Sequence, residues 1–580
     1  MTVTFTSNTP PSVAITSPTN GASFIAPATI AIQATASDSD GSITNVQFFD
    51  GTASLGNVSS SPYNLSVSLA LGSHALTAVA SDNLGATTTA SSVTVTVTTN
   101  TPLADVSIPD PGLNAAVRAT LAKPTGPVTV QDLLTLTNLD ASHRSISNVT
   151  GLEFAANLLS LNLQDNLLSN PAFPTNLSRL TSLDLSQNRF GTFTLPSNLT
   201  GLIFLNLGFN GLTNVSLPDG LTNLNWLLIQ GNNFLTDLTL PQGLTALARL
   251  DLNQNLLGQI TLPVDMRSLT NLHLSDNQFF SLTLPAGMTN LTSLLLDQNH
   301  LDNLALPPDM EKLAVLDLFG NEVTNLTIPA SLTALTDLRL AINRLGSFTL
   351  PAGLTNLARL DLFENILTSF TLPSGLTALT NLDLGVNPLT TFTLPPDATN
   401  LISLSFIFSQ LTNLNLPPGL HSLSTLLLSG NKLTTLNLPV GLSSLTSLNL
   451  ANNQLTNVTL PPDLQQLTEI SLDGNPLTTF VLSEEQLANL EETVATLQGQ
   501  GINVFTYPLT IQLVRPRPLT GAFQFGITGP PGVYSVLAST NLTDWTPVGI
   551  SSNALGSVSF VDQTSDLFPQ RFYRVLMQAP

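Results

Sequence analysis

The 580-residue sequence contains no cysteine, and only 9% of its residues are charged. Without cysteine the chain cannot form disulfides, thiolate-ligated metal sites or a thiol nucleophile. Lysine and arginine number 16 against 37 aspartates and glutamates, so the net charge is −21. A net anion gains nothing by approaching nucleic acid, so we expect no such partner. No apolar run approaches the ~18 residues of a membrane span, and the first residues lack the features of a signal peptide.

Catalytic motifs are also missing from the sequence. The five histidines are scattered, and there is no H-E-x-x-H, G-x-S-x-G or phosphate-binding glycine motif in a strand-to-helix context. We therefore predict no catalytic residues and no enzymatic activity, and no cofactor apart from a weak calcium candidate. Asp38 and Asp40 lie in a D-S-D-G turn, and Asp82 in the S-D-N-L-G turn is the residue that could join them. The alternative, which we favour, is Asx turns between strands.

A repeat occupies the middle of the chain, residues 136–482. The pattern L-x-x-L-x-L-x-x-N returns every 22 residues in about sixteen units, except for one step of 23. The extra residue falls at Asn233 or its neighbour, where we expect a bulge. Ser409 replaces the asparagine in one unit, and Phe406 replaces a leucine there, which predicts a local distortion. The asparagines, called the ladder asparagines below, are Asn166, Asn188, Asn210, Asn232, Asn255, Asn277, Asn299, Asn321, Asn343, Asn365, Asn387, Asn431, Asn453 and Asn475.

Each column of the repeat has a physical reason. The two middle leucines alternate on a short strand and point inward, and a buried asparagine can satisfy backbone groups where the chain leaves the strand. Most units close with a second apolar pair and a proline, which neither donates to a sheet nor fits inside a helix. We therefore predict a parallel sheet on one side of the array and extended segments, not helices, on the other.

The flanking segments differ from the repeats. Residues 1–99 alternate apolar and polar residues in short runs between turns, which predicts a β-sandwich, and 100–108 read as a linker. Residues 109–135 form an N-terminal cap with helical spacing over 109–123, and 483–507 form a C-terminal helical cap with helical spacing over 483–497, beginning at Ser483. Residues 508–580 predict a small β-domain, with Trp545 and Phe572 in its core.

Three resemblances follow from these patterns. The repeats have the leucine-rich-repeat pattern. The order SPTNGASF, ASDSDGSITNVQFFDG and SPYNLSVSLALGSHALTAVASDNLGA resembles bacterial immunoglobulin-like modules, and GVYSVLASTNLTDWTPV with RFYRV resembles a small C-terminal β-domain of exported proteins of Verrucomicrobia-like bacteria. The whole string resembles the internalin-like class of bacterial surface proteins, although in that class the immunoglobulin-like module usually follows the repeats.

The resemblance implies a mainly β fold, in which a leucine-rich-repeat solenoid is flanked by an immunoglobulin-like sandwich and a small β-domain. It also implies an extracellular or cell-surface protein from which a signal peptide has been removed, and a concave sheet that binds a partner. Side chains two, four and six positions before each ladder asparagine point outward on that sheet. Aromatic and arginine side chains there are typical of binding patches, whereas aspartate is also common filler in such repeats. The predicted ligand-binding residues are Phe204, Trp226, Arg249, Asp251, Asp317, Phe319, Arg339, Arg359, Asp361 and Phe363.

The functional hypothesis is an extracellular bacterial binding or adhesion protein that recognises a protein or a glycan on its concave face. The alternative is a structural subunit of an extracellular filament or sheath that self-associates through its terminal β-domains. Few charges, abundant threonine and asparagine and a long regular array are consistent with this alternative.

Overall fold

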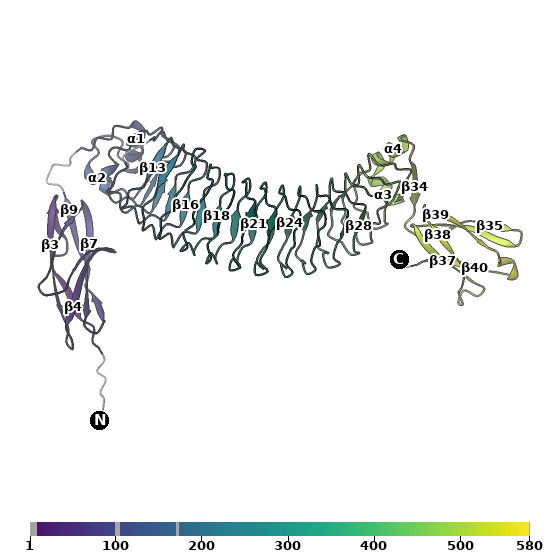
Figure 1. Cartoon of the computed structure of the whole chain (residues 1–580), viewed down its shortest axis with the longest axis horizontal. Coiled ribbons are helices and arrows are strands. Elements are labelled where there is room, and N and C mark those ends of the chain that lie inside the picture. The colour runs from purple at the N-terminus through teal and green to yellow at the C-terminus, as the bar shows by residue number, and fades with distance from the viewer. Residues whose placement is uncertain (1–7, 99–104, 170–172, 579–580) are drawn as a thin grey trace, which may run out of the picture. The chain divides into compact units, whose positions relative to one another are not determined.

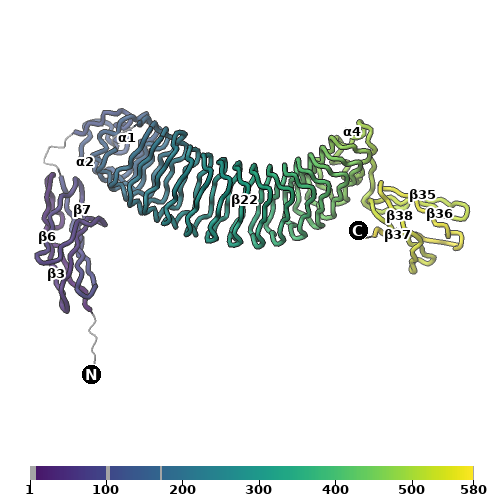
Figure 2. Tube along the Cα trace, in the orientation of Figure 1, coloured from purple at the N-terminus to yellow at the C-terminus, as the bar shows by residue number. Residues whose placement is uncertain are grey.

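The computed structural model describes residues 8–98, 105–169 and 173–578. The chain divides into two compact units, Met1–Leu227 and Leu228–Pro580, and each is described by itself. Figure 1 labels the elements, and Figure 2 follows the chain trace through them. The structure is mainly β, as predicted.

The N-terminal segment folds as two sheets of a sandwich. Alternation places Ile30, Val46, Phe48, Leu76 and Val95 between the sheets, where each is at most 1% exposed. One sheet contains β1 (Ser12–Ser17), β3 (Ala28–Ser37) and β6 (Tyr63–Leu69); the other contains β2 (Ala22–Ile25), β9 (Val93–Thr98), β7 (Gly72–Asp82), β4 (Ile43–Asp50) and β5 (Ala53–Val58), with β8 (Thr87–Thr89) beside β7. The predicted linker falls largely at 99–104, outside the described residues.

The repeats form a solenoid with one strand per unit on its main sheet. Sixteen strands pair in parallel and in chain order, which confirms the predicted sheet of about sixteen units. Equivalent leucines pair in register, for example Leu316 with Leu338 and Leu338 with Leu360. The strands are β10 (Asn138–Asp140), β11 (Ser160–Asn162), β12 (Ser182–Asp184), β14 (Phe204–Asn206), β16 (Trp226–Leu228), β17 (Arg249–Asp251), β18 (Asn271–His273), β19 (Ser293–Leu295), β21 (Val315–Asp317), β23 (Asp337–Arg339), β24 (Arg359–Asp361), β25 (Asn381–Asp383), β27 (Ser403–Ser405), β29 (Thr425–Leu427), β30 (Ser447–Asn449) and β32 (Glu469–Ser471).

The opposite side of the solenoid is extended. After the 3₁₀ turn η1 (Leu152–Phe154), no described residue before α3 (Glu484–Asn489) lies in a helix. Short strands pair there instead, as the proline in most repeats predicts. They are β13 (Thr192–Thr194) with β15 (Asn214–Ser216), β20 (Asn303–Leu304) with β22 (Asn325–Leu326), β26 (Thr391–Thr393) with β28 (Asn413–Asn415), and β31 (Asn457–Thr459) with β33 (Thr479–Ser483) and β34 (Asn503–Tyr507).

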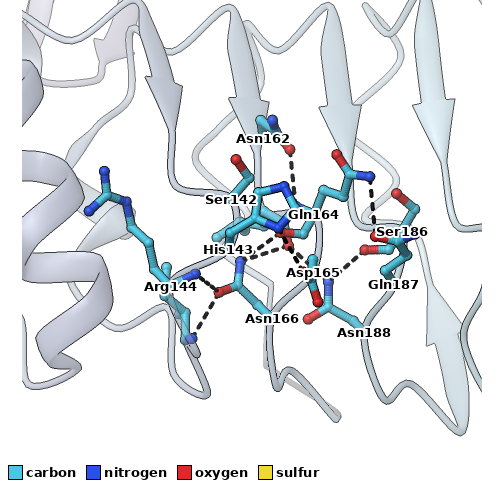
Figure 3. Close-up of polar contacts among 12 residues, drawn as sticks. Ser142, His143, Arg144, Asn162, Gln164, Asp165, Asn166, Ser186, Gln187 and Asn188 are labelled. Atoms are coloured by element: carbon cyan, nitrogen blue, oxygen red, sulfur yellow. Dashed lines mark hydrogen bonds and ion pairs between the residues drawn. The ribbon is translucent and has the colours of Figure 1, made fainter.

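The ladder asparagines bind the backbone of two neighbouring turns. Asn188 donates from Nδ2 to the carbonyls of Leu163 (2.9 Å) and Leu185 (3.1 Å). Its Oδ1 accepts the amide N–H of Leu168 at 3.0 Å. Figure 3 shows this amide beside that of Asn166, which makes the equivalent contacts one turn earlier. Because these groups are buried, each asparagine satisfies donors and acceptors that water cannot reach. The same bond to the carbonyl 25 residues earlier recurs at Asn277, Asn299, Asn321, Asn343, Asn365, Asn387, Asn431 and Asn453.

The residue before each ladder asparagine has a left-handed backbone. Non-glycine residues there, such as Asp165, Ile342 and Val386, have φ between 50° and 56°. Glycine fills the position in four units, with φ between 66° and 73° at Gly231, Gly320, Gly430 and Gly474. The column varies too much in residue type for the sequence pattern to have singled it out, although the four glycines are a signal for positive φ.

Both predicted irregularities in the ladder are local. Asn233 and the 63% exposed Phe234 form a turn directly after Asn232, and Leu235 returns to the core, so the extra residue is absorbed outside it. At the other irregular unit Ser409 is buried and donates to the carbonyl of Leu384 at 3.3 Å, which keeps one of the ladder bonds.

Helices lie at both ends of the array. Asp110 caps α1 (Pro111–Thr120), and α2 (Val130–Leu134) starts with a capping box at Thr129. Ser483 caps α3 (Glu484–Asn489) through a capping box with Gln486, where the sequence placed the start. The single helix predicted over 483–497 was wrong, because Leu490 leaves helical geometry (φ −120°, ψ 25°) and α4 (Glu491–Gly499) begins a new axis. The break keeps Leu490 buried, and β34, which the helical spacing did not predict, then joins the back sheet.

The C-terminal segment forms two three-stranded sheets. Its core contains Phe525, Ile527, Tyr534, Val536 and Phe560. The sheets contain β35 (Gln512–Leu519), β36 (Ala522–Thr528) and β39 (Ser557–Asp562), and β38 (Thr546–Asn553), β37 (Gly532–Ser539) and β40 (Phe572–Met577); η2 (Ser565–Leu567) precedes β40.

The prediction that Trp545 and Phe572 belong to this core was wrong. Phe572 lies on the outward positions of β40 and is 37% exposed, whereas Tyr573 and Val575 on the other face pack against the core. Trp545 lies in the turn before β38, partly exposed, and its indole N–H donates to the Leu542 carbonyl at 3.2 Å.

Candidate functional site

The strand face is the name we give to the outward side chains of the sixteen-stranded sheet. It comprises the residues two, four and six positions before each ladder asparagine, which alternate with the buried leucines. Every predicted ligand-binding residue lies on this face. Phe204 and Trp226 belong to the first compact unit, Met1–Leu227, and the others belong to the second compact unit, Leu228–Pro580.

In the first compact unit the strand face carries an aromatic pair. Phe204 and Trp226 begin the neighbouring strands β14 and β16, and their ring centroids are 6.2 Å apart with the planes inclined at 50°. Trp226 is 44% exposed. The two rings therefore form the contiguous aromatic surface that the repeat register predicts.

In the second compact unit a small charge cluster lies on β17 and β18. Asp251 accepts from Arg249 Nη2 at 2.9 Å and lies 3.2 Å from His273 Nδ1. Its carboxyl is buried beneath these neighbours. Burial opposes ionisation, but the contacts with His273 and Arg249 outweigh it and lower the pKa of Asp251. The carboxylate of Asp251 is therefore ionised and fixed by these two side chains, and it is not an exposed ligand-binding group.

A longer ion-pair network crosses β21, β23 and β24. Arg339 contacts Asp317 at 3.1 Å and Asp337 at 2.7 Å. Arg359 contacts Asp361 at 3.1 Å and approaches Asp337 to 4.0 Å. The structure thus brings together four predicted site residues, and Asp337, which the sequence analysis did not select, bridges the two arginines.

Negative charge exceeds positive charge around this network. Asp297 and Asp383 flank it on the neighbouring strand-face positions, so five aspartates surround two arginines. Burial, together with the charge of Asp297, raises the pKa of Asp317 in spite of Arg339. Burial and the charge of Asp361 likewise raise the pKa of Asp383. A cationic group placed here would favour the ionised form of both carboxylates.

The aspartates also have a structural role that the sequence analysis did not foresee. Asp317 Oδ1 accepts the backbone N–H of Phe319 at 3.0 Å, and Asp361 Oδ1 accepts that of Phe363 at 3.2 Å. The bond closes an Asx turn where the strand ends. It explains why aspartate or asparagine recurs at this column without any ligand. The same contact occurs at Asp184, Asn206, Asp251, Asp383 and Asn449.

Apolar side chains lie beside the network. Phe319 and Phe363 are half-buried on the strand face. A β-carbon at Gly385 would come within 3.1 Å of the Phe363 ring and 2.8 Å of Ile407 Cγ1, so these two side chains close over the glycine. Phe408, the next residue in the chain, is 61% exposed and its ring lies against Gly430. The F-I-F run at the broken ladder position was the sequence signal for this apolar surface, and we interpreted it only as a distortion.

Two of the three calcium candidates are bound by backbone N–H groups. Asp40 Oδ2 accepts the N–H of Thr9 at 2.9 Å, which lowers the pKa of Asp40. Asp82 is buried and accepts from the N–H of Leu84 and Ala86 at 2.8 and 2.9 Å. In the described part of the chain no three histidine or acidic side chains could hold a metal ion together. The Asx-turn interpretation accounts for these contacts.

The search for membrane-spanning segments gives a simple result. Among residues 8–98, 105–169 and 173–578, no helix has both the length and the apolar character needed to cross a bilayer.

These features define a class of protein: a capped solenoid of short parallel strands with aromatic, charged and apolar side chains on the strand face. A family model described as a BspA type leucine rich repeat region matches six copies over residues 186–300, 274–383 and 384–494, which is more than half of the chain. The chain belongs to this family. A model described as a bacterial Ig domain matches residues 11–78. The two matches confirm the resemblances drawn for the repeats and the N-terminal module, and that of the C-terminal domain stays a prediction.

Solved structures of repeat proteins are similar to the chain. An internalin (inlF) from Listeria monocytogenes is 24% identical, and the match covers 64% of this chain and 91% of that one with a TM-score of 0.37. The functional domain of InlJ from Listeria monocytogenes is 18% identical over 80% and 95%, with a TM-score of 0.46. YopM from Yersinia enterocolitica is 25% identical over 63% and 96%, with a TM-score of 0.43. No curated protein matches the sequence.

Proposed function

We propose that the protein binds a protein partner through the strand face of its second unit, over β21 to β27, and that it does so outside the cell or on its surface. Proteins with leucine-rich repeats typically mediate protein binding. The observation that carries the proposal is the ion-pair network from Asp317 to Asp361 beside the apolar side chains of Phe363 and Ile407.

The network favours binding because it is already ordered. Arg339 and Arg359 are held by carboxylates before any partner arrives, so less side-chain entropy is lost on association. The excess of aspartates favours a partner that presents lysine or arginine, and the aromatic side chains offer apolar anchors next to them. The chemistry therefore fits a basic, partly apolar protein surface.

The aromatic pair of the first unit supports a second candidate, a glycan. The exposed ring of Trp226 beside Phe204 offers a flat apolar surface on which a sugar ring can stack. A glycan array probed with the full chain and with Trp226→Ala tests this candidate directly, and retention that depends on Trp226 would establish it.

The protein-binding proposal is tested by quantitative capture. The full chain, immobilised, is exposed to extracts of its native environment, and retained proteins are quantified for the wild type, Phe363→Ala and Asp383→Asn. We expect the amount of one specific protein retained by each variant to be at least about tenfold lower than the amount retained by the wild type. A lysine-rich peptide should compete for this binding better than an aspartate-rich peptide of equal length. Thr349→Ala is the matched control, because Thr349 is exposed on the opposite side of the solenoid. Equal capture by wild type and both strand-face variants would refute the proposal.

A further inference from the structure

The exposed edge of strand β40 is unlike the edge of strand β35 in the other sheet of the C-terminal domain. In the described part of the chain β40 has one sheet neighbour, β37. Strand β35, an edge strand of the other three-stranded sheet, contains Pro516 and Pro518 and a register shift between Val514 and Arg517. Prolines and bulges are devices that prevent an edge strand from pairing with another chain. The β40 sequence, FYRVLM, contains neither.

The register fixes which backbone groups of β40 point away from the sheet. Gln578 N–H donates to the Val533 carbonyl at 2.8 Å, so even-numbered residues of β40 face β37. The backbone N–H and C=O groups of Tyr573, Val575 and Met577 therefore point to the open edge. Three successive free donor–acceptor pairs on an apolar strand are a template for a further strand.

The surface around this edge is apolar for so small a domain. Of the exposed large apolar side chains in the described residues, twelve lie after residue 507 and sixteen before it. Ile550, Val533 and Leu576 lie on the outer face of the sheet β38-β37-β40, with exposures of 67%, 40% and 42%. Exposed apolar surface beside a free edge marks an interaction site.

The charge distribution favours a second copy of the same domain as the occupant. Residues 508–580 contain four arginines and three aspartates, so the domain carries a net charge of +1. The rest of the chain therefore carries −22, which gives the total of −21. Residues 1–507 of two copies therefore repel each other, whereas the net charge of this domain is close to zero. We propose that the protein self-associates through antiparallel pairing of β40 with β40 of a second copy.

The pairing has a defined register. With the two-fold axis at Val575, Tyr573 of one copy lies opposite Met577 of the other, and three residues of each copy exchange backbone hydrogen bonds. Arg574 then lies opposite Leu576 of the second copy, so the two arginines do not face each other. Tyr573 and Val575 keep their places over the domain core. Because the contact is small, it gives a concentration-dependent equilibrium and not a permanent dimer.

Met577→Pro in the full chain tests the pairing. Proline removes one N–H that points to the open edge and leaves the ladder to β37 intact, since proline is tolerated on edge strands in this orientation. We expect sedimentation velocity across a concentration series to show reversible dimerisation of the wild type and a dissociation constant raised at least about tenfold in Met577→Pro.

Two matched variants keep the test decisive. Met577→Ala removes the same side chain and keeps the N–H, so it should dimerise within about threefold of the wild type. Ile550→Lys places a charge on the same outer face but at the far strand, β38, and should also dimerise. A wild type that stays monomeric at all concentrations overturns the inference. So does equal weakening by Met577→Ala and Met577→Pro, or a loss confined to Ile550→Lys, which would indicate stacking of sheet faces.

Discussion

At the scale of the residue, the asparagine ladder carries a measurable share of the stability. Asn365 donates to the carbonyls of Leu340 and Leu362 and accepts the N–H of Leu345. Serine is too short to reach all three groups and has a single proton. We expect Asn365→Ser to lower the free energy of unfolding by about 2 kcal/mol, because buried backbone groups lose their partners. Denaturant unfolding measures the change.

The same chain contains the reverse experiment. Ser409 already occupies a ladder position, with one bond to Leu384. Ser409→Asn should raise the stability or leave it unchanged, because it can restore the missing contacts. A large loss in Ser409→Asn together with no loss in Asn365→Ser would show that packing around Phe406, and not the ladder, governs these positions.

The left-handed backbone conformation at the position before each ladder asparagine predicts which substitutions there stabilise the fold. Val386 has φ 51°, a conformation that β-branched residues adopt only with strain, whereas asparagine tolerates it. We expect Val386→Asn to stabilise the fold by up to about 1 kcal/mol. The opposite change, Asn452→Val, introduces the strain at an exposed position with φ 55° and should destabilise by about 1 kcal/mol. Thermal unfolding of both variants checks the pair, and shifts of the same sign would contradict the argument.

At the scale of the element, the 23-residue unit is predicted to tolerate deletion of Asn233. The extra residue lies in a surface turn with Phe234, while Asn232 and Leu235 keep their places in the core. Deletion restores the 22-residue spacing of the other units, so the free energy of unfolding should change by no more than about 0.5 kcal/mol. Loss of cooperative unfolding would show that the turn has a structural duty.

The strand β16 predicts a separation of binding from stability. Trp226 is 44% exposed beside Phe204, so its removal opens no cavity in the core. We expect Trp226→Ala to weaken binding at the first-unit strand face by about 2 kcal/mol and to leave the unfolding midpoint unchanged. Isothermal titration with a glycan retained on the array measures the first quantity. Phe234→Ala, exposed in the surface turn, is the control, and a lower midpoint with unchanged binding would make Trp226 structural.

The elements show how far the sequence determines the fold. The leucine spacing, the ladder asparagines and the proline in most repeats were sufficient to predict sixteen parallel strands and a helix-free back, because each column has one physical role. The break at Leu490 was not predictable from helical spacing, since the apolar positions continue across it.

The candidate site was less accessible to sequence analysis. Alternation identified which side chains face outward, but not that Asp251 and Asp317 lie buried beneath their neighbours. Asp337 bridges two arginines only because residues 22 positions apart become lateral neighbours, and the sequence analysis treated each column residue singly. The outward position of Phe572 depends on the phase of one strand, which its short sequence does not define.

At the scale of the whole molecule, charge is divided unevenly along the chain. Residues 1–507 carry a net charge of −22, while residues 508–580 are close to neutral. Repulsion between two copies therefore opposes any association, whichever surface mediates it. Association through backbone and apolar contacts should strengthen when this repulsion is screened, whereas association through arginine–aspartate pairs between copies should weaken.

Ionic strength therefore distinguishes the two modes of self-association. The screening length falls from about 10 Å at 0.1 M salt to about 3 Å at 1 M. We expect the dissociation constant of the dimer to fall at least about threefold between these conditions, because long-range repulsion between two chains of charge −21 is removed and the β40 contact is uncharged apart from Arg574. Sedimentation velocity in sodium chloride and in sodium perchlorate at matched ionic strength separates screening from salting-out. A dissociation constant that rises in both salts would mean that opposite charges, not strand pairing, hold the copies together.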